Sequence, residues 1–106
     1  MSPTTQTATP EITRITPRCD VFCVSNEIDL ESYKEKMQNG DWGDISDEGK
    51  ECNDDSLYFG YGLLIAVYPI HDRWVIEITH DLEDKVMEID AIEYPATYLF
   101  SKVVEP

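Results

Sequence analysis

The fold is decided by residues 63–91, LLIAVYPIHDRWVIEITHDLEDKVMEIDA, where apolar and polar side chains follow the two-residue period of β-strands. Residues 63–68 and 74–79 are short apolar runs rich in β-prone side chains. Pro69 closes the first run and a short polar link joins it to the second. The pattern therefore predicts an antiparallel hairpin.

A third strand is predicted after the turn at residues 81–84. Within it the apolar side chains of Met87, Ile89 and Ala91 alternate with the carboxylates of Glu88 and Asp90. The sheet should therefore have one dry face and one wet, acidic face. Residues 98–104 predict either a final edge strand or a packed tail, because Pro95 interrupts the chain before them.

The first helix upstream of this sheet should begin at a cap supplied by Asn26 or Asp29. Its apolar face would carry Leu30, Tyr33 and Met37, which recur at helical spacing. Residues 39–40, Asn-Gly, tolerate left-handed geometry and predict its end.

The second helix should begin at Asp44 or Ser46 and end at or before Gly60. Between the helices, residues 40–44 read GDWGD. Its two glycines free the backbone, and Trp42 supplies a large apolar anchor that should hold this turn against the sheet. Asn53, or Asp44 itself, is expected to satisfy the backbone donors of the turn.

The N-terminal part divides into two predicted regions. Residues 1–18 are rich in Thr and Pro and predict a flexible tail. Residues 19–106 predict one compact domain, beginning with a short buried strand at residues 20–24, DVFCV. The predicted fold class is α+β: a strand, two helices, and then an antiparallel meander of three or four strands.

Charge is the most unusual property of the composition. The 106 residues hold 22 Asp and Glu against 8 Lys and Arg, a formal net charge of −14. Such a field repels nucleic acids and anionic membranes and attracts basic surfaces. We therefore expect no direct nucleic-acid binding and no membrane association, and we expect a partner protein with a basic surface.

Cellular location and redox state follow from what the sequence lacks. No apolar run approaches the length of a membrane helix, and the start of the chain does not have the pattern of a signal peptide. The three cysteines, Cys19, Cys23 and Cys52, show no C-x-x-C spacing. We expect a cytoplasmic protein with free thiols. The sequence does not indicate the oligomeric state.

Catalytic chemistry is not expected. The two histidines, His71 in a turn and His80 at a strand end, have no link to a cysteine, and we expect exposed histidines and buried cysteines. No cofactor is expected, because the glycines of the GDWGD turn stand beside acids rather than the bases of a phosphate site. One alternative is a regulatory module binding a divalent cation with the oxygen donors of Asp41, Asp44, Asp47 and Glu48, although the spacing is not that of an EF-hand loop.

Acidic residues concentrate in two regions of the sequence. Residues 27–55 carry eleven acids against three lysines, and residues 72–93 carry eight acids against Arg73 and Lys85. Carboxylates spaced along a surface can imitate the phosphates of a duplex, although a merely solvated acidic face explains the same pattern. The candidate binding residues are Asp41, Asp44, Asp47, Glu48, Glu51, Asp54, Asp55, Glu88 and Asp90, with Trp42 and Asn53 as structural anchors.

The GDWGD turn also carries a resemblance. Together with Glu48, Lys50, Asn53 and Asp54 in the helix that follows, it resembles a family of small bacterial proteins catalogued as plasmid-related. The resemblance continues through residues 64–68, residues 74–76 with Thr79, and residues 93–94, whereas residues 77–78 depart from the family pattern. It implies residence on plasmids, phages or other mobile elements, and it transfers no catalytic residue because the family has no settled activity.

These observations predict a non-catalytic acidic binding protein from a mobile element. One form of it is an anti-defence inhibitor that mimics DNA and blocks a nucleic-acid-handling host protein. The alternatives are an antitoxin or immunity protein that neutralises a basic nuclease, and the cation-binding module described above.

Overall fold

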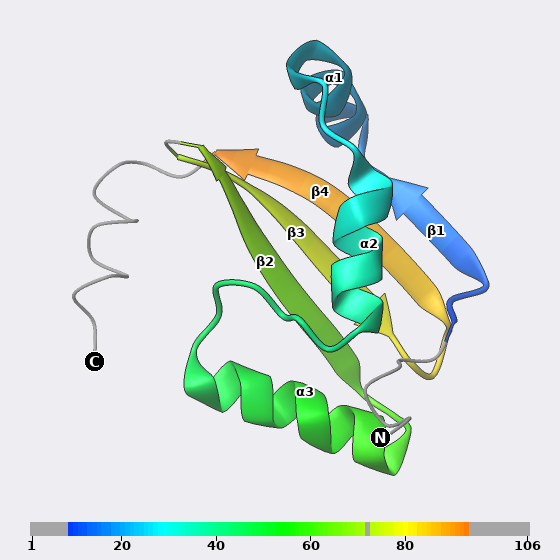
Figure 1. Ribbon diagram of the computed structural model, residues 1–106. Helices are drawn as coiled ribbons and strands as arrows, with labels where there is room; N and C mark the ends of the chain where they lie inside the picture. Colours follow the sequence, from blue (N-terminus) through cyan, green and yellow to red (C-terminus); the bar gives the residue numbers. More distant parts are fainter. Residues whose placement is uncertain (1–8, 72, 94–106) are drawn as a thin grey trace.

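The structure, a computed structural model, describes residues 9–71 and 73–93. Figure 1 shows a small α+β domain, as the sequence predicts. Its elements in chain order are β1 (Ile12–Ile15), α1 (Pro17–Asn26), α2 (Leu30–Gln38), α3 (Asp47–Phe59), β2 (Leu63–His71), β3 (Trp74–Asp81) and β4 (Val86–Glu93).

The four strands form one sheet in the order β1-β4-β3-β2. The meander β2-β3-β4 is antiparallel, as its alternating sequence predicts. β1, however, pairs parallel with β4, with Ile12 opposite Val86 and Ile15 opposite Ile89. The sheet is therefore mixed rather than purely antiparallel.

β1 lies within residues 1–18, where the sequence predicts a flexible tail. All four of its side chains are exposed, so they show no alternation that could reveal a strand. Backbone bonds at its two ends fix it beside β4: Glu11 N–H donates to the carbonyl of Lys85, and Thr16 N–H donates to that of Ile89. The sequence boundary between residues 18 and 19 falls inside α1.

The strand predicted at residues 20–24 is wrong, because this segment is part of α1. Thr16 caps the helix, its side chain accepting from the N–H of Cys19, and Pro17 occupies the first turn, where its missing N–H costs nothing. The buried side chains, Cys19, Phe22 and Cys23, lie at helical spacing, whereas the valines at 21 and 24 are exposed. The apolar run at residues 20–24 is too short for its periodicity to distinguish a helix from a strand.

The other two helices begin and end where the sequence predicts. Asp29 caps α2 by accepting from the N–H of Glu31, and Asn39 follows its last residue. Ser46 caps α3 by accepting from the N–H of Gly49, and Gly60 ends it with a left-handed φ of 81°.

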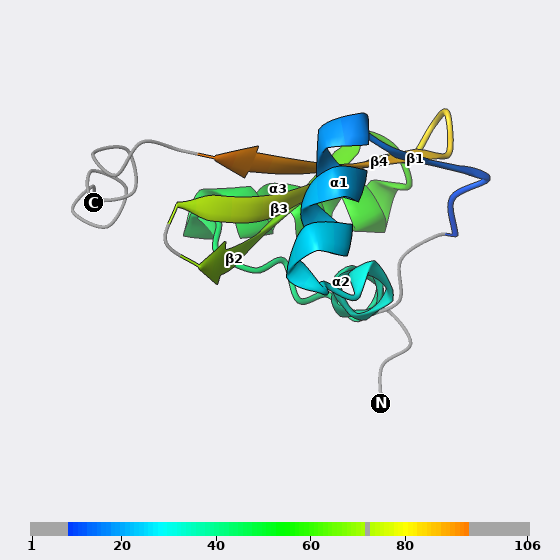
Figure 2. The ribbon, with the colours of Figure 1, turned by 90° about the horizontal axis from the view of Figure 1, so that it is seen from above.

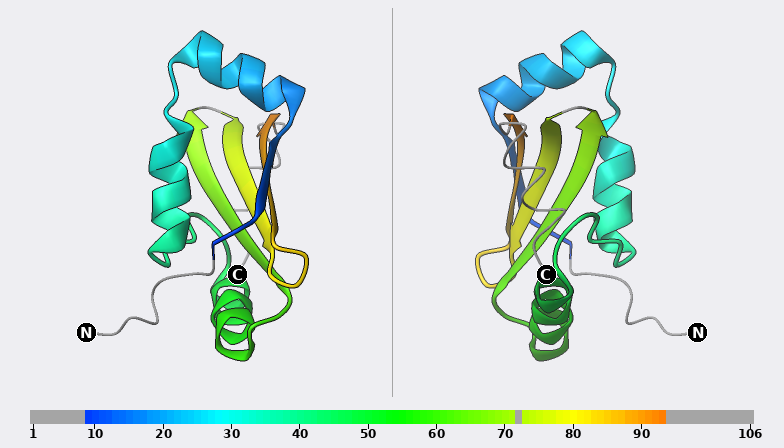
Figure 3. Two further views of the ribbon diagram at one scale, coloured as in Figure 1. Left: turned by 90° about the vertical axis from the view of Figure 1, so that its right-hand side faces the viewer. Right: turned by 90° about the vertical axis from the view of Figure 1, so that its left-hand side faces the viewer.

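The core lies between one face of the sheet and the two N-terminal helices (Figures 2 and 3). Phe22 of α1 stacks on Trp74 of β3 with ring centroids 4.3 Å apart, and Tyr33 of α2 lies 5.2 Å from Tyr68 of β2. Trp42 is also buried in this core. The dry face is shared by alternate residues of three strands: Leu64, Ala66, Tyr68, Ile76, Ile78, Met87, Ile89 and Ala91.

The predicted end of the first hairpin strand is wrong. β2 does not end at Pro69 but continues to His71, because a register shift between those two residues accommodates the proline. The strand or tail predicted at residues 98–104 lies outside the described residues.

Candidate functional site

α3 lies beside β2 rather than over the core (Figure 1). One buried side chain, that of Asn53, fixes it there. Asn53 donates its amide to the carbonyl of Ile65 at 2.8 Å and accepts from the N–H of the same residue at 3.1 Å. Its side chain thus reproduces the pairing that another strand would make. Asn53 was expected to bind the GDWGD turn; it binds the outer edge of β2 instead.

The GDWGD turn covers the next part of the same edge. Val67 donates its N–H to the carbonyl of Trp42 at 3.1 Å, and Asp44 donates its N–H to the carbonyl of Val67 at 2.6 Å. Gly43 has φ 76°, and a Cβ there would lie 2.1 Å from the carbonyl oxygen of Val67, so the close approach requires glycine. With Asn53, this turn closes an edge that would otherwise be open to another chain.

The acidic face of α3 lies opposite this attachment. We use this name for five exposed carboxylates, those of Asp47, Glu48, Glu51, Asp54 and Asp55. At 100° per residue they fall within about 120° of the helix circumference and along about 12 Å of its length. Asn53 points away from this arc, because it lies on the side that meets β2. The structure therefore brings these five candidate residues together on one surface.

Asp41, the first acid of the GDWGD turn, has two local partners. The carboxylate of Asp41 accepts from the N–H of Gly43 at 3.1 Å and lies 3.8 Å from the ammonium of Lys36. Asp44 is exposed just before α3. Both residues lie beside the acidic face in sequence, and Asp41 has part of its charge balanced.

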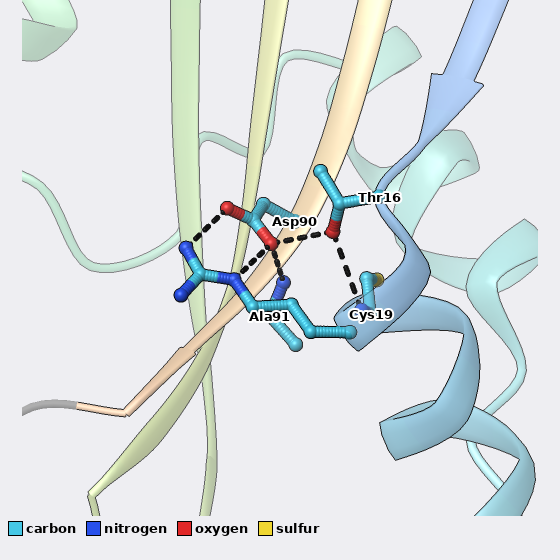
Figure 4. A network of polar contacts seen from close by, with 5 residues as sticks. Thr16, Cys19, Asp90 and Ala91 are labelled. Carbon is cyan, nitrogen blue, oxygen red and sulfur yellow. Dashed lines mark hydrogen bonds and ion pairs between the residues drawn. The ribbon is translucent and has the colours of Figure 1, made fainter.

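Asp90 and Glu88 were expected to act together on the wet face of the sheet, but their surroundings differ. Asp90 accepts two bonds from the guanidinium of Arg18, at 2.9 and 2.7 Å, and one from the hydroxyl of Thr16 at 2.6 Å (Figure 4). The Arg18 bond, more than any other interaction, holds the pKa of this carboxyl below its usual range. Asp90 thus ties α1 to β4, whereas Glu88 is exposed.

Glu77 adds a further carboxylate to the wet face, opposite Asp90 on the neighbouring strand. Burial raises the pKa of Glu77 and the charge of Asp90 raises it further, while Arg18 opposes both effects. Beside this group, Arg14, Leu63, Thr79, Asp81, Asp84, Val86 and Glu88 line a shallow hollow.

The basic residues do not balance the acidic surface. Five of the seven basic side chains in residues 9–71 and 73–93 form ion pairs with carboxylates: Arg18–Asp90, Lys34–Glu31, Lys36–Asp41, Arg73–Glu93 and Lys85–Glu11. None of these pairs involves the acidic face of α3, whose nearest base in sequence is Lys50. The negative field over α3 is therefore neutralised less than that around Asp90.

The expectation of exposed histidines is wrong for His80. It is fully buried on the core side of β3, and neither ring nitrogen has a hydrogen-bond partner among the described residues. The expectation of buried cysteines is confirmed for Cys19 and Cys23, whose sulfurs lie 3.9 Å apart, and is wrong for Cys52, which is exposed. Burial raises the pKa of Cys19 to about 12, so this thiol is a poor nucleophile at neutral pH.

The cation site expected around Asp41, Asp44, Asp47 and Glu48 is not assembled. Throughout the described part of the chain, no three His, Cys, Asp or Glu side chains come together as metal ligands. Capping and turn bonds instead explain much of this region: Asp41 closes the turn, and Asp47 and Glu48 lie in the first turn of α3, where carboxylates favour the helix dipole.

An aromatic patch at the end of α3 was missed from the sequence. It consists of Tyr58, Phe59 and Tyr61, with centroid distances of 5.0 Å between the first two rings and 6.2 Å between the last two. Their exposed fractions are 83%, 61% and 59%. The only sequence signal is the clustering of three rings around two glycines in residues 58–62, and it does not distinguish buried from exposed rings.

The candidate functional site is thus a surface rather than a cavity: the acidic face of α3 with the aromatic patch at its C-terminal end. No helix in the described residues has the length and apolar character needed to cross a membrane. The chain matches no protein-family model, no curated protein and no solved structure.

Proposed function

We propose that this protein is a non-catalytic inhibitor that binds a basic, nucleic-acid-handling protein through the acidic face of α3. The observation that carries the proposal is the arrangement of five exposed carboxylates on one side of a helix that is fixed to the sheet by Asn53. A rigid row of negative charges can occupy a groove that otherwise holds the phosphates of a duplex.

Three further features support this proposal. The net charge of −14 steers the protein toward basic surfaces and away from nucleic acid. The acidic face has no ion pair among the described basic residues, so its charge is available to a partner. The resemblance of the GDWGD turn to plasmid-related proteins supports a mobile-element origin, in which blocking a host defence protein would favour the element.

Competition with DNA tests the proposal. The immobilised chain is exposed to a bacterial lysate, and retained proteins are challenged with duplex DNA and, separately, with increasing salt. We expect a basic nucleic-acid-handling protein that both treatments release, because DNA and the acidic face would share one groove. Retained proteins that resist both treatments would refute the mimicry of DNA.

The identity of the retained protein decides between two forms of the function. A host defence nuclease or other DNA-handling enzyme supports the anti-defence form. A basic nuclease encoded beside this protein, whose activity falls when the two are mixed, indicates an immunity protein instead.

A further inference from the structure

We infer that Tyr58, Phe59 and Tyr61 form the apolar centre of the docking site, and that its occupant is a protein surface carrying apolar side chains flanked by Arg or Lys. This inference rests on the proposed function and specifies the chemistry of the partner. It concerns the region where α3 ends and β2 begins (Figure 1).

The position of Tyr58 joins the patch to the acidic face. Tyr58 follows Asp54 by four residues and Asp55 by three, so its ring lies on the same side of α3 as those carboxylates. A partner bound along the acidic face could therefore contact the aromatic patch at the same time. Leu63, also exposed, lies two residues beyond Tyr61 and extends the apolar surface onto β2.

The rings are exposed to a degree that folding does not explain. Tyr58, Phe59 and Tyr61 contact one another, yet each leaves more than half of its surface open to solvent. Aromatic side chains are the residues that most often contribute the central energy of protein interfaces, and they lose little conformational entropy on binding. A group of three rings beside a charged face has the form of an interface centre with a polar rim.

The end of α3 favours a cation at the same place. Its last turn contains no basic residue, so the partial negative charge of the helix C-terminus is not met by its own side chains. Gly60, in the left-handed region with φ 81°, leaves open space beside the last turn, where an added Cβ would meet nothing within 4 Å. An Arg or Lys of the partner can thus approach the carbonyls and lie over an aromatic ring.

A second copy of this chain is the less favourable occupant. Each copy carries a net charge of −14, and contact through the patch would bring two acidic faces together. Complementary charge requires a basic partner.

Two synthetic helical peptides of equal positive charge provide the probe. One carries leucines on one face and lysines and arginines elsewhere; in the other, glutamines replace the leucines. Binding is measured for the wild type, for Y58Q/F59Q/Y61Q, and for E51Q/D54N/D55N. The control is V21Q/V24Q, which removes exposed apolar side chains from α1 and leaves the charge unchanged.

We expect the aromatic variant to bind the leucine-faced peptide about tenfold more weakly and the glutamine-faced peptide almost as the wild type does. V21Q/V24Q should match the wild type with both peptides. The amide signals of Gly60 and Gly62 should shift when the leucine-faced peptide is titrated into the wild-type protein.

Three outcomes would overturn the inference. An aromatic variant that binds both peptides like the wild type shows that the patch is not the docking centre, even if the acidic variant loses both. An acidic variant that loses neither peptide refutes the basic partner and with it the proposed function. Self-association of the wild type that disappears in the aromatic variant identifies a second copy as the occupant.

Discussion

At the residue scale, His80 has surroundings that its sequence position did not indicate. It lies in the core opposite Leu64 and Met87 of the neighbouring strands, with both ring nitrogens lacking partners within the described residues. Burial lowers its pKa below 6.5, and the carboxylate of Asp81 opposes this only in part. The folded state therefore favours the neutral ring.

His80 predicts a loss of stability in mild acid. Below the unfolded pKa of 6.5, the unfolded chain takes up a proton on this ring while the folded chain resists it. Above pH 6.5 the titration of His80 has little effect on the free energy of unfolding. As the pH falls below that value, it lowers the free energy of unfolding by up to about 1.4 kcal/mol per pH unit.

Replacing His80 with leucine removes this dependence. Urea unfolding of His80→Leu should give a stability equal to or greater than that of the wild type at about pH 7.5, and this advantage should grow by up to about 1.4 kcal/mol at about pH 5.5. Because the two proteins share all other titrating groups, the contribution of those groups drops out of the difference between the two stabilities. A constant difference at both pH values would show that the ring is not held neutral.

Asp90 has the opposite role, since its charged form is the one that the fold stabilises. Its pKa is lowered from 3.8, so its stabilising effect is complete above that value and is lost as the pH falls through the folded pKa. Asp90→Asn should lower the Tm by a few degrees at neutral pH, and this loss should shrink as the pH falls below 3.8. Glu88→Gln, which changes an exposed carboxylate on the same strand, should leave the Tm nearly unchanged. Equal effects of the two substitutions at neutral pH would contradict the role given to the Arg18–Asp90 pair.

At the scale of elements, the edge of β2 depends on Asn53. Asn53→Ala leaves the N–H and carbonyl of Ile65 without their partners, and should cost about 1–3 kcal/mol in the free energy of unfolding. The neighbouring Asp54→Ala, on the exposed side of α3, should cost less than about 0.5 kcal/mol. Chemical unfolding of both variants measures the difference. Equal costs would show that α3 is held by other contacts.

The sequence predicted the elements whose signals are local. α2 and α3 have caps at both ends, and the meander alternates over three strands, so each could be located within a few residues. β1 could not be located, because its partner β4 lies more than seventy residues later and its own side chains do not alternate in burial. Part of α1 was predicted as a strand, because its β-prone side chains were given more weight than the helix cap at Thr16.

The candidate site was predictable only in part for the same reason. The five acids of α3 follow from the helix assignment, because spacing alone puts them on one side. The internal role of Asp90 depends on Arg18, which is distant in sequence, and so it was not seen. The exposure of Tyr58, Phe59 and Tyr61 depends on where α3 packs, which Asn53 determines through β2.

At the scale of the whole molecule, net charge and the placement of charge lead to different expectations for binding. If charge alone mattered, any three exposed acids would be equivalent in binding. If the acidic face of α3 is the site, its carboxylates should matter more than others, because attraction within a contact exceeds that across a screened distance. E51Q/D54N/D55N and E27Q/E35Q/E83Q test this, since each removes three exposed acids that have no ion pair among the described residues.

The most direct measurement is the salt dependence of binding between the purified partner and the wild type and these two variants. The account predicts that E51Q/D54N/D55N binds at least about tenfold more weakly at low salt, with a shallower dependence of affinity on salt, while E27Q/E35Q/E83Q retains most of the wild-type affinity and slope. Equal losses in the two variants would mean that only the net charge matters, and would contradict α3 as the binding surface.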